Sequence, residues 1–288
     1  MPDDIEEQIE TLHDGRGFVR LVGWRVVRVA GHDAVGWLHD LLTADIASLA
    51  PGEACHSLLL GPTGRIRADL HVVRRDDDVV LLQSPDQPDD IGDLLEPFTL
   101  SSDVILEPLT GDVEMLAIPG VAADAGIPTL IGPNVGILAP SGRGLDAVMG
   151  GVLSDRDQRE VSAEAAERWR IEMGIPRMGV DFDTTSLPAE AGLDETIAYD
   201  KGCFLGQESV ARVRNLGHPP TVLRHVRSDG VLRAGDLVAG PNDVIGSVTS
   251  ATARRGGWTA LVRVPWAGRT VDLTTAGGRP VRDVPHAG

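Results

Sequence analysis

A short segment near residue 200 brings several reactive side chains close together. It reads Asp200-Lys201-Gly202-Cys203-Phe204-Leu205-Gly206-Gln207-Glu208 and continues to Arg212 and Arg214. A helix beginning near Gly206 would direct unpaired backbone N–H groups toward whatever lies over the turn, which favours an anion or a thiolate. Cys203, two residues from Lys201, is therefore a candidate reactive thiol. Glu208 and Arg212 are four residues apart and can pair on the same helix.

Lys201 stands out because 25 of the 26 basic residues are arginine and it is the one lysine. An ammonium is compact and flexible whereas a guanidinium is planar, so either chance or a specific requirement places lysine here. Each residue of the segment also has a structural interpretation. Cys203 can be a small buried hydrophobe, Lys201 a surface charge and Gln207 a solvated helix residue. His218 is the only nearby histidine, which gives a Cys/His nucleophilic pair weak support.

The elements that must position these groups begin with a predicted β-hairpin. Ser57–Leu60 and Ile66–Val73 are strand-like and flank the turn sequence Gly61-Pro62-Thr63-Gly64. In the second strand, the alternation places Ala68, Leu70 and Val72 on one face and Asp69 with His71 on the other. From this pattern alone, Asp69 reads as a solvent-facing carboxylate beside Arg67 and His71.

The remaining pattern alternates strands and helices before it changes near Pro219. Asp33 is placed to cap a helix with apolar residues at helical spacing, and Ser162 to cap another that ends at Gly174. A third helix is expected at 89–97, and the long polar connection 175–199 is typical of a functional loop. Further strands are expected at 26–30, 79–82, 114–118 and 134–138. From Pro219, Gly-containing turns separate predicted strands at 222–226, 236–239, 244–249, 258–264 and 270–274, which favours a small antiparallel barrel.

Composition narrows the class of protein. With 42% hydrophobic residues, the 288-residue chain can bury a core. Its net charge of −17 has the wrong sign for a protein whose whole surface binds nucleic acid. Residues 1–200 carry a net charge of −23 and residues 201–288 a net charge of +6. This difference indicates either charged faces exposed to solvent or an anionic ligand that binds the basic C-terminal part. No direct nucleic-acid partner is expected.

Cysteine count and hydropathy predict a cytoplasmic protein. The two cysteines, Cys55 and Cys203, form no metal-binding spacing and no disulfide framework. The first fourteen residues hold six acids and no base, unlike a signal peptide. Prolines interrupt the most apolar stretch, 115–140, so we expect no membrane helix. Because the cysteines have no metal-binding spacing, we also expect no bound metal.

The segment Lys201–Glu208 resembles the K-G-C-[YF]-x-G-Q-E signature of YgfZ-type folate-binding proteins, which are relatives of the glycine-cleavage T-protein (aminomethyltransferase). Three further stretches look similar to that family: Arg170–Pro176 with Gly179 and Asp181, Leu187–Glu190, and Ile245–Ser250. The resemblance extends over most of the chain, with the Lys-Gly-Cys motif as its most specific part. Phe204 stands where tyrosine is commoner, which removes a hydroxyl.

The resemblance implies an α+β fold, with a three-lobed body around a central channel and a C-terminal antiparallel β-barrel. It predicts a two-lobed folate-binding region at 1–218 and a barrel domain at 219–288. The cofactor would be tetrahydrofolate or a one-carbon derivative of it. The implied role is that of an accessory protein for the assembly or maintenance of iron–sulfur enzymes, with client proteins as partners and a link to tRNA modification.

Family positions carry over to this chain residue by residue. The functional residues would be the thiol of Cys203 and the carboxylate of Asp69, and the folate-binding residues would be Lys201, Gly202, Gly206, Gln207, Glu208, Arg212 and Glu190. Two departures concern the enzyme reaction. True aminomethyltransferases carry adjacent aspartates where this chain has Ala68-Asp69, and an acidic Gly-Glu-x-Gly-Phe-Glu stretch where it has 132–138 without an acid.

Three functions therefore stay open from sequence. The first is the folate-binding accessory role. The second is a folate-dependent aminomethyltransferase or demethylase, which the missing acids disfavour. The third is a scaffold whose basic barrel docks a partner through Arg254, Arg255 or Arg263.

Overall fold

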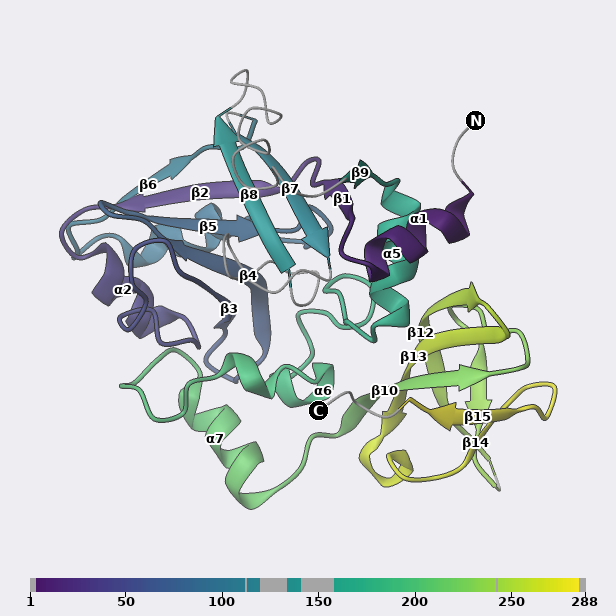
Figure 1. Ribbon diagram of the computed structural model, residues 1–288. Coiled ribbons are helices and arrows are strands. Elements are labelled where there is room, and N and C mark those ends of the chain that lie inside the picture. The colour runs from purple at the N-terminus through teal and green to yellow at the C-terminus, as the bar shows by residue number, and fades with distance from the viewer. Residues whose placement is uncertain (1–3, 112, 120–133, 141–157, 242, 285–288) are drawn as a thin grey trace.

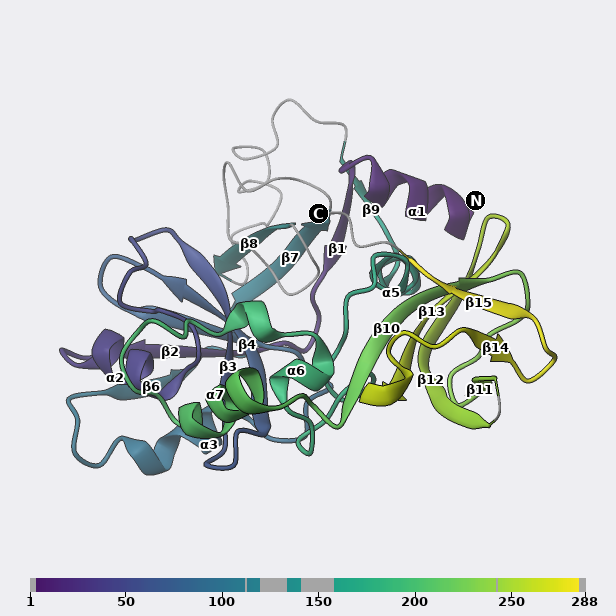
Figure 2. The same cartoon turned by 90° about the horizontal axis from the view of Figure 1, so that it is seen from below.

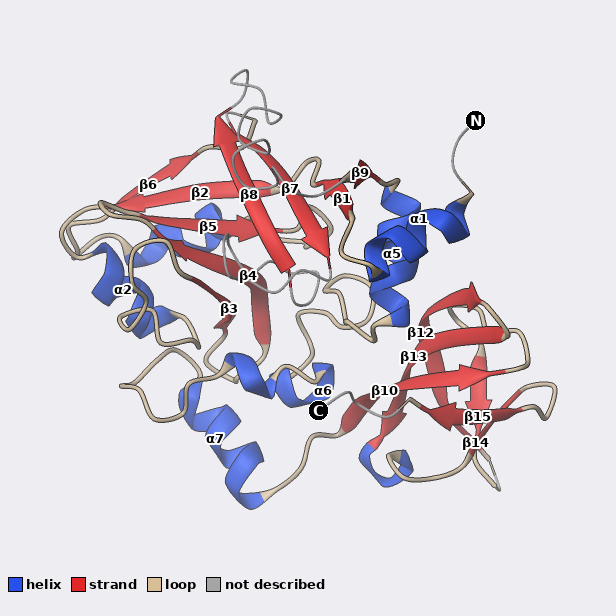
Figure 3. Ribbon diagram, in the orientation of Figure 1, coloured by secondary structure: helices blue, strands red, loops and turns tan. Residues whose placement is uncertain are grey.

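The computed structural model describes residues 4–111, 113–119, 134–140, 158–241 and 243–284. They form an α+β fold in which two sheets and their helices make up a body and a barrel lies beside it (Figures 1 and 3). The helices are α1 (Ile5–His13), α2 (Ala34–Leu41), α3 (Ile91–Leu95), α5 (Ala163–Glu172), α6 (Pro188–Ala191) and α7 (Gln207–Leu216), with 3-10 turns at Glu96–Phe98, Asp194–Thr196 and Trp266–Gly268. No helix in these ranges has both the length and the apolar character needed to cross a membrane.

A five-stranded sheet carries the largest core cluster. Its strands, in spatial order, are β3 (Ala54–Leu60), β4 (Ile66–Arg74), β5 (Val79–Gln83), β2 (Arg25–Ala30) and β6 (Ile105–Pro108). Apolar residues on one face, such as Leu70 and Leu81, pack against Leu38 of α2 and Ile91 of α3. This burial explains why the alternating pattern of β4 forms a strand with one strongly apolar face.

The predicted β-hairpin is confirmed. β3 and β4 pair antiparallel, with Leu58 opposite Asp69 and His56 opposite His71. Gly64 completes the connecting turn with φ +75°, a left-handed conformation that glycine adopts without strain. The expected cap of α2 differs in one respect. Asp33 occupies the N-cap position, but its carboxylate accepts a hydrogen bond from the backbone N–H of Asp103 at 2.8 Å and caps no helical N–H.

A second sheet covers the other face of the first one. Its order is β8 (Asn134–Pro140), β7 (Val113–Pro119), β1 (Gly17–Arg20) and β9 (Arg159–Glu160), and it lies across the five-stranded sheet in both views (Figures 1 and 2). Met115 of β7 packs with Val26 and Leu82 of the five-stranded sheet. The interpretation of Asp69 as a solvent-facing carboxylate beside His71 is wrong, because both residues are buried.

Helices α1 and α5 pack together beside β1. Leu12, Trp169 and Val19 form their shared apolar cluster. The predicted cap of α5 is confirmed, since Ser162 Oγ accepts a hydrogen bond from the N–H of Ala165 at 3.2 Å. The helix ends just before Gly174, whose φ is +72°. One face of α5, which carries Ala163, Ala166, Glu167 and Arg170, lines a cavity.

The C-terminal part forms the predicted closed antiparallel barrel. Its order is β10 (Thr221–Ser228), β13 (Gly257–Pro265), β12 (Val244–Arg254), β11 (Leu237–Ala239), β14 (Leu273–Thr275) and β15 (Pro280–Asp283). The sequence pattern missed β15, which is short and starts with proline. Figure 2 shows the barrel beside the body, with α5 and α6 lying between the two parts.

Candidate functional site

The candidate site is a cavity of about 280 Å³ on the side of the body that carries α5. Five segments distant in sequence contribute to it: residues 19–22 and Trp24 at the end of β1 and in the turn after it, Asp69 of β4, the loop 84–87 after β5, one face of α5, and residues 176–178. Its size is close to the lower limit of ordinary small-molecule sites, which span roughly 300–1,000 Å³.

Asp69 places a carboxylate in the wall of the cavity. The residue is only 6% exposed, and its backbone is held from both sides by the amide of Gln87. The Asp69 N–H donates to Gln87 Oε1 at 2.9 Å, and Gln87 Nε2 donates to the Asp69 carbonyl at 2.5 Å. Gln83 in turn donates from Nε2 to Gln87 Oε1 at 3.2 Å. These hydrogen bonds hold the backbone of Asp69 against the loop after β5.

Arg177 supplies the opposite charge on the facing wall. Its Nη1 lies 3.3 Å from carboxylate oxygens of both Asp86 and Glu167, and all three residues line the cavity. Its Nε is buried and has no hydrogen-bond partner among the described residues. An unpaired buried N–H carries a cost that a bound acceptor group would remove.

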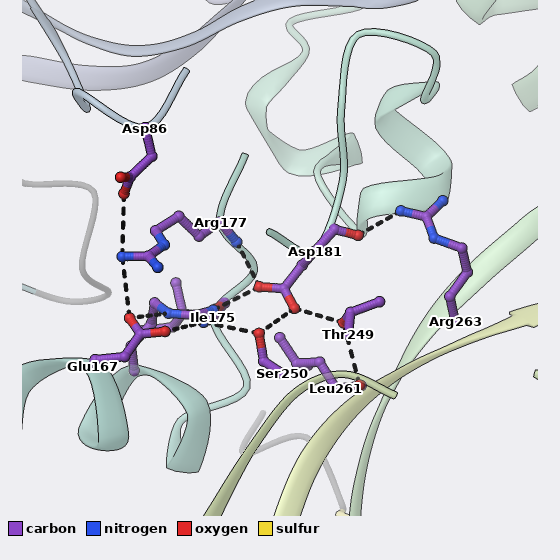
Figure 4. A network of polar contacts seen from close by, with 10 residues as sticks. Asp86, Glu167, Ile175, Arg177, Asp181, Thr249, Ser250, Leu261 and Arg263 are labelled. Carbon is purple, nitrogen blue, oxygen red and sulfur yellow. Dashed lines mark hydrogen bonds and ion pairs between the residues drawn. The ribbon is translucent and has the colours of Figure 1, made fainter. Parts of the chain in front are cut away.

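A buried polar network stands behind this wall and connects it to the barrel (Figure 4). Asp181 is fully buried and lies 2.7 Å from Arg170 Nη1. Its Oδ1 accepts hydrogen bonds from Thr249 Oγ1 at 2.6 Å and Ser250 Oγ at 2.5 Å, both on β12. The backbone N–H of Arg177 donates to Asp181 Oδ2 at 3.0 Å. Asp181 thus joins the cavity wall to the barrel.

The charge of Arg170 is stabilised where it lies. Burial by itself lowers the pKa of Arg170, but hydrogen bonds to Glu167 and the charge of Asp181 outweigh it and raise the pKa above its ordinary value. Both charges of the Arg170–Asp181 pair are desolvated, so each depends on the other and on the surrounding hydroxyls.

The Lys-Gly-Cys segment lies elsewhere. Lys201 Nζ donates to the carbonyl oxygens of His39, Leu42 and Ala44 at the end of α2. Burial lowers the pKa of Lys201 to about 8. Cys203 is exposed. None of the residues from Lys201 to Glu208 is among those that line the cavity.

The predicted helix start at Gly206 is confirmed, with Gly206 at the N-cap of α7 and a φ of +82°. A Cβ at this position would lie 2.6 Å from the carbonyl oxygen of Gly61, so the close approach is to the β3–β4 turn. Gly202 has open space around it. Glu208 and Arg212 form the expected pair at 3.3 Å, and both are exposed.

Glu190 has a structural role. Its carboxylate accepts a hydrogen bond from the N–H of Leu187 at 2.9 Å, and from Thr221 Oγ1 at 2.6 Å. It therefore connects α6 to β10. Of the residues predicted from sequence, the cavity lining contains Asp69 and lacks Lys201, Gly202, Cys203, Gly206, Gln207, Glu208, Arg212 and Glu190.

Sequence reasoning missed Trp24, Gln87 and Arg177, which line the cavity. Gln87 follows Gln83 by four residues in an acid-rich stretch, a weak signal that only the fold makes meaningful. The stretch 132–138 without an acid begins outside the described residues, which resume at Asn134 in β8.

Comparisons with known proteins agree with this architecture. Residues 1–134 match the family profile of the GCVT N-terminal domain. The chain is 28% identical to an aminomethyltransferase of Alcanivorax borkumensis, over 99% of this chain and 89% of that protein. It is 24% identical to an aminomethyltransferase of Geobacillus kaustophilus, over 96% of this chain and 87% of that protein.

A solved structure has the same fold. The crystal structure of glycine cleavage system aminomethyltransferase T from Bartonella henselae superposes with a TM-score of 0.79 at 21% identity, covering 96% of this chain and 88% of that one. The chain therefore has an aminomethyltransferase-like fold, with aminomethyltransferases among its homologues.

Proposed function

We propose that this protein binds tetrahydrofolate or a one-carbon derivative in the cavity beside α5, and that it acts in the cytoplasm as an accessory protein for iron–sulfur enzymes. The observation that carries the proposal is that one cavity is lined by an acid, Asp69, which is buried, and by a cation, Arg177. A reduced pterin presents N–H donors and carbonyl or ring-nitrogen acceptors on one planar ring, and it therefore needs both kinds of partner.

The other lining residues fit the same ligand. Trp24, Leu21 and Pro85 offer apolar surface for the faces of a ring. Arg20, whose side chain is 40% exposed, lies at the cavity and suits the carboxylates of a glutamate tail. Bound tetrahydrofolate would supply one-carbon chemistry, while the chain orients the ring through Asp69 and Arg177.

The accessory role rests on the resemblance of the Lys-Gly-Cys segment and on the position of Cys203. The thiol is exposed and lies outside the cavity lining, which favours contact with another protein over attack on a unit carried by the cavity ligand. Clients of this kind would be iron–sulfur proteins, including those that modify tRNA. The alternative, an aminomethyltransferase, would use Asp69 without the second adjacent carboxylate, because Ala68 occupies that position.

Calorimetric titration with tetrahydrofolate tests the binding proposal. We expect saturable binding by the wild-type protein and at least a tenfold larger Kd for Asp69→Asn, which corresponds to about 1.4 kcal/mol. Glu208→Gln is the matched control because it removes an exposed carboxylate outside the cavity. No saturable heat with the wild-type protein would contradict the proposal.

Complementation of a strain that lacks the protein tests the accessory role. Cys203→Ser should retain tetrahydrofolate affinity within about threefold but fail to restore the activity of iron–sulfur enzymes. Full rescue by this variant would remove the thiol from the proposed function. Turnover of a methylamine-type donor by the purified protein would instead favour the aminomethyltransferase.

A further inference from the structure

Asp69 has a hydrogen-bonded histidine partner that the sequence motifs do not include. His56 Nε2 contacts Asp69 Oδ1, and because a carboxylate only accepts, the imidazole donates. The β3–β4 register explains the contact. His56 lies opposite His71, and Asp69 is two residues before His71 on the same face of the sheet.

His71 completes the cluster from behind. It is 3% exposed and stacks on His56, with ring centroids 5.0 Å apart and planes 14° from parallel. Neither of its ring nitrogens has a hydrogen-bond partner among the described residues. Burial, together with the nearby His56, lowers the pKa of His71 well below its ordinary value, so His71 stays neutral.

Asp69 and His56 form a route from the cavity to solvent. Asp69 lines the cavity and its side chain is 9% exposed, whereas the side chain of His56 is 31% exposed. The carboxylate thus lies between the ligand position and an imidazole that reaches water. Across the cavity the charged lining groups are Asp86, Glu167, Arg170 and Arg177, with Arg20 near the rim, and opposite His71 on β5 lies the apolar Leu82.

We propose that His56 is the positioning residue of Asp69 and carries protons between that carboxylate and solvent when a ligand with a basic or N–H nitrogen occupies the cavity. Water delivers a proton to Nδ1 of His56, the Nε2–H proton passes to Asp69 Oδ1, and Asp69 passes a proton to the ligand nitrogen; the reverse transfer restores the starting state. Only N–H and O–H bonds form and break. The identity of the ligand as a reduced pterin rests on the proposed function.

The pair can be tested without ligand by NMR of the histidine side chains. We expect a hydrogen-bonded Nε2–H signal that is absent in His56→Gln and is lost or strongly shifted in Asp69→Asn. His32→Gln is the matched control, because His32 also pairs with a neighbouring aspartate, Asp33, but on the surface. An unchanged His56 signal in Asp69→Asn would overturn the pairing.

Proton exchange on binding tests the transfer. Tetrahydrofolate is mixed rapidly with the protein in weakly buffered solution containing a pH indicator, which gives the rate of proton exchange with the solution. His56→Gln can still donate a hydrogen bond to Asp69 but cannot relay a proton. We expect its Kd within about threefold of wild type, with proton exchange at least about fivefold slower, and a Kd at least about fivefold larger for His56→Ala.

Wild-type proton exchange in His56→Gln would overturn the relay. Absence of tetrahydrofolate binding by the wild-type protein would refute the proposed function and the ligand assigned to the relay. The NMR spectra without ligand would then still decide whether His56 holds Asp69.

Discussion

Lys201 Nζ donates a hydrogen bond to the backbone carbonyl of Ala44 at 2.8 Å. The same ammonium also donates to the carbonyls of His39 and Leu42, so its three N–H groups meet three oxygens near the end of α2. Carbonyls at a helix C-terminus have no partner within the helix. A planar guanidinium cannot direct three N–H groups from a single nitrogen toward three separate oxygens. This difference gives a physical reason for the single lysine in an arginine-rich chain.

Replacement of Lys201 should change how stability depends on pH. Burial lowers its pKa from 10.5 to about 8, so between these values the unfolded chain binds more protons and the free energy of unfolding rises with pH. We expect Lys201→Met to be less stable than wild type by about 1–3 kcal/mol near pH 7. The gap should widen toward about pH 10, because the variant lacks this rise.

Urea unfolding at the two pH values measures the gap. Arg212→Met serves as the control, because it removes an exposed cation. A gap that narrows as the pH increases would contradict the expected sign.

Gly206→Ala should destabilise the protein, and Gly202→Ala should not. At Gly206 the φ of +82° and the 2.6 Å approach of a Cβ to the Gly61 carbonyl both oppose a side chain, at a cost of about 1–3 kcal/mol or more. At Gly202 a Cβ meets open space, so the change should be within about 0.5 kcal/mol. Thermal and urea unfolding compare the two variants, and equal stabilities would show that the turn relaxes around Gly206.

Asp181→Asn should weaken the connection between the body and the barrel. The variant leaves Arg170 buried with one anionic partner fewer, which we expect to cost about 3 kcal/mol or more in unfolding free energy. Glu208→Gln breaks an exposed ion pair instead and should stay within about 0.5 kcal/mol of wild type. Denaturant midpoints give both values, and similar effects of the two changes would mean that the buried pair is dispensable.

The two cysteines should differ in reactivity. Burial raises the pKa of Cys55 from 9.0 to about 12, which reduces its thiolate fraction by about 1,000-fold at neutral pH. Cys203 is exposed. Alkylation of the native protein by iodoacetamide should modify one thiol, and Cys203→Ser should abolish this modification. Mass spectrometry counts the labels on each protein. As a control, the unfolded protein should take two labels. Rapid labelling of Cys55 in the native protein would contradict the argument from burial.

Local patterns in the sequence predicted many of the elements. Alternation and the Gly61–Gly64 turn determine the β3–β4 hairpin, and Ser162 and Gly174 delimit α5 through ordinary capping chemistry. The barrel followed from short strands separated by glycine turns. These features depend on neighbouring residues, which is why one sequence is sufficient to predict them.

The candidate site depends on distant residues and was therefore predicted only in part. Asp69 was singled out through the resemblance to aminomethyltransferases, but Trp24, Gln87 and Arg177 meet it only when loops from three segments converge. The burial of Asp69 and His71 could not be inferred from β4 alone. The contact between His56 and Asp69 follows from the hairpin register, but the first predicted strand began at Ser57 and left His56 out, and the register shifts between Leu59 and Leu60.

The hydroxyls of Thr249 and Ser250 come from the barrel, yet they solvate a charge that belongs to the other part of the chain. A fragment truncated before β10 would leave Asp181 and Arg170 short of these donors, and water would have to enter to replace them. Recombinant production of either half by itself is thus a poor route to a working pocket, and amino-acid changes in the barrel can alter ligand affinity without touching the ligand.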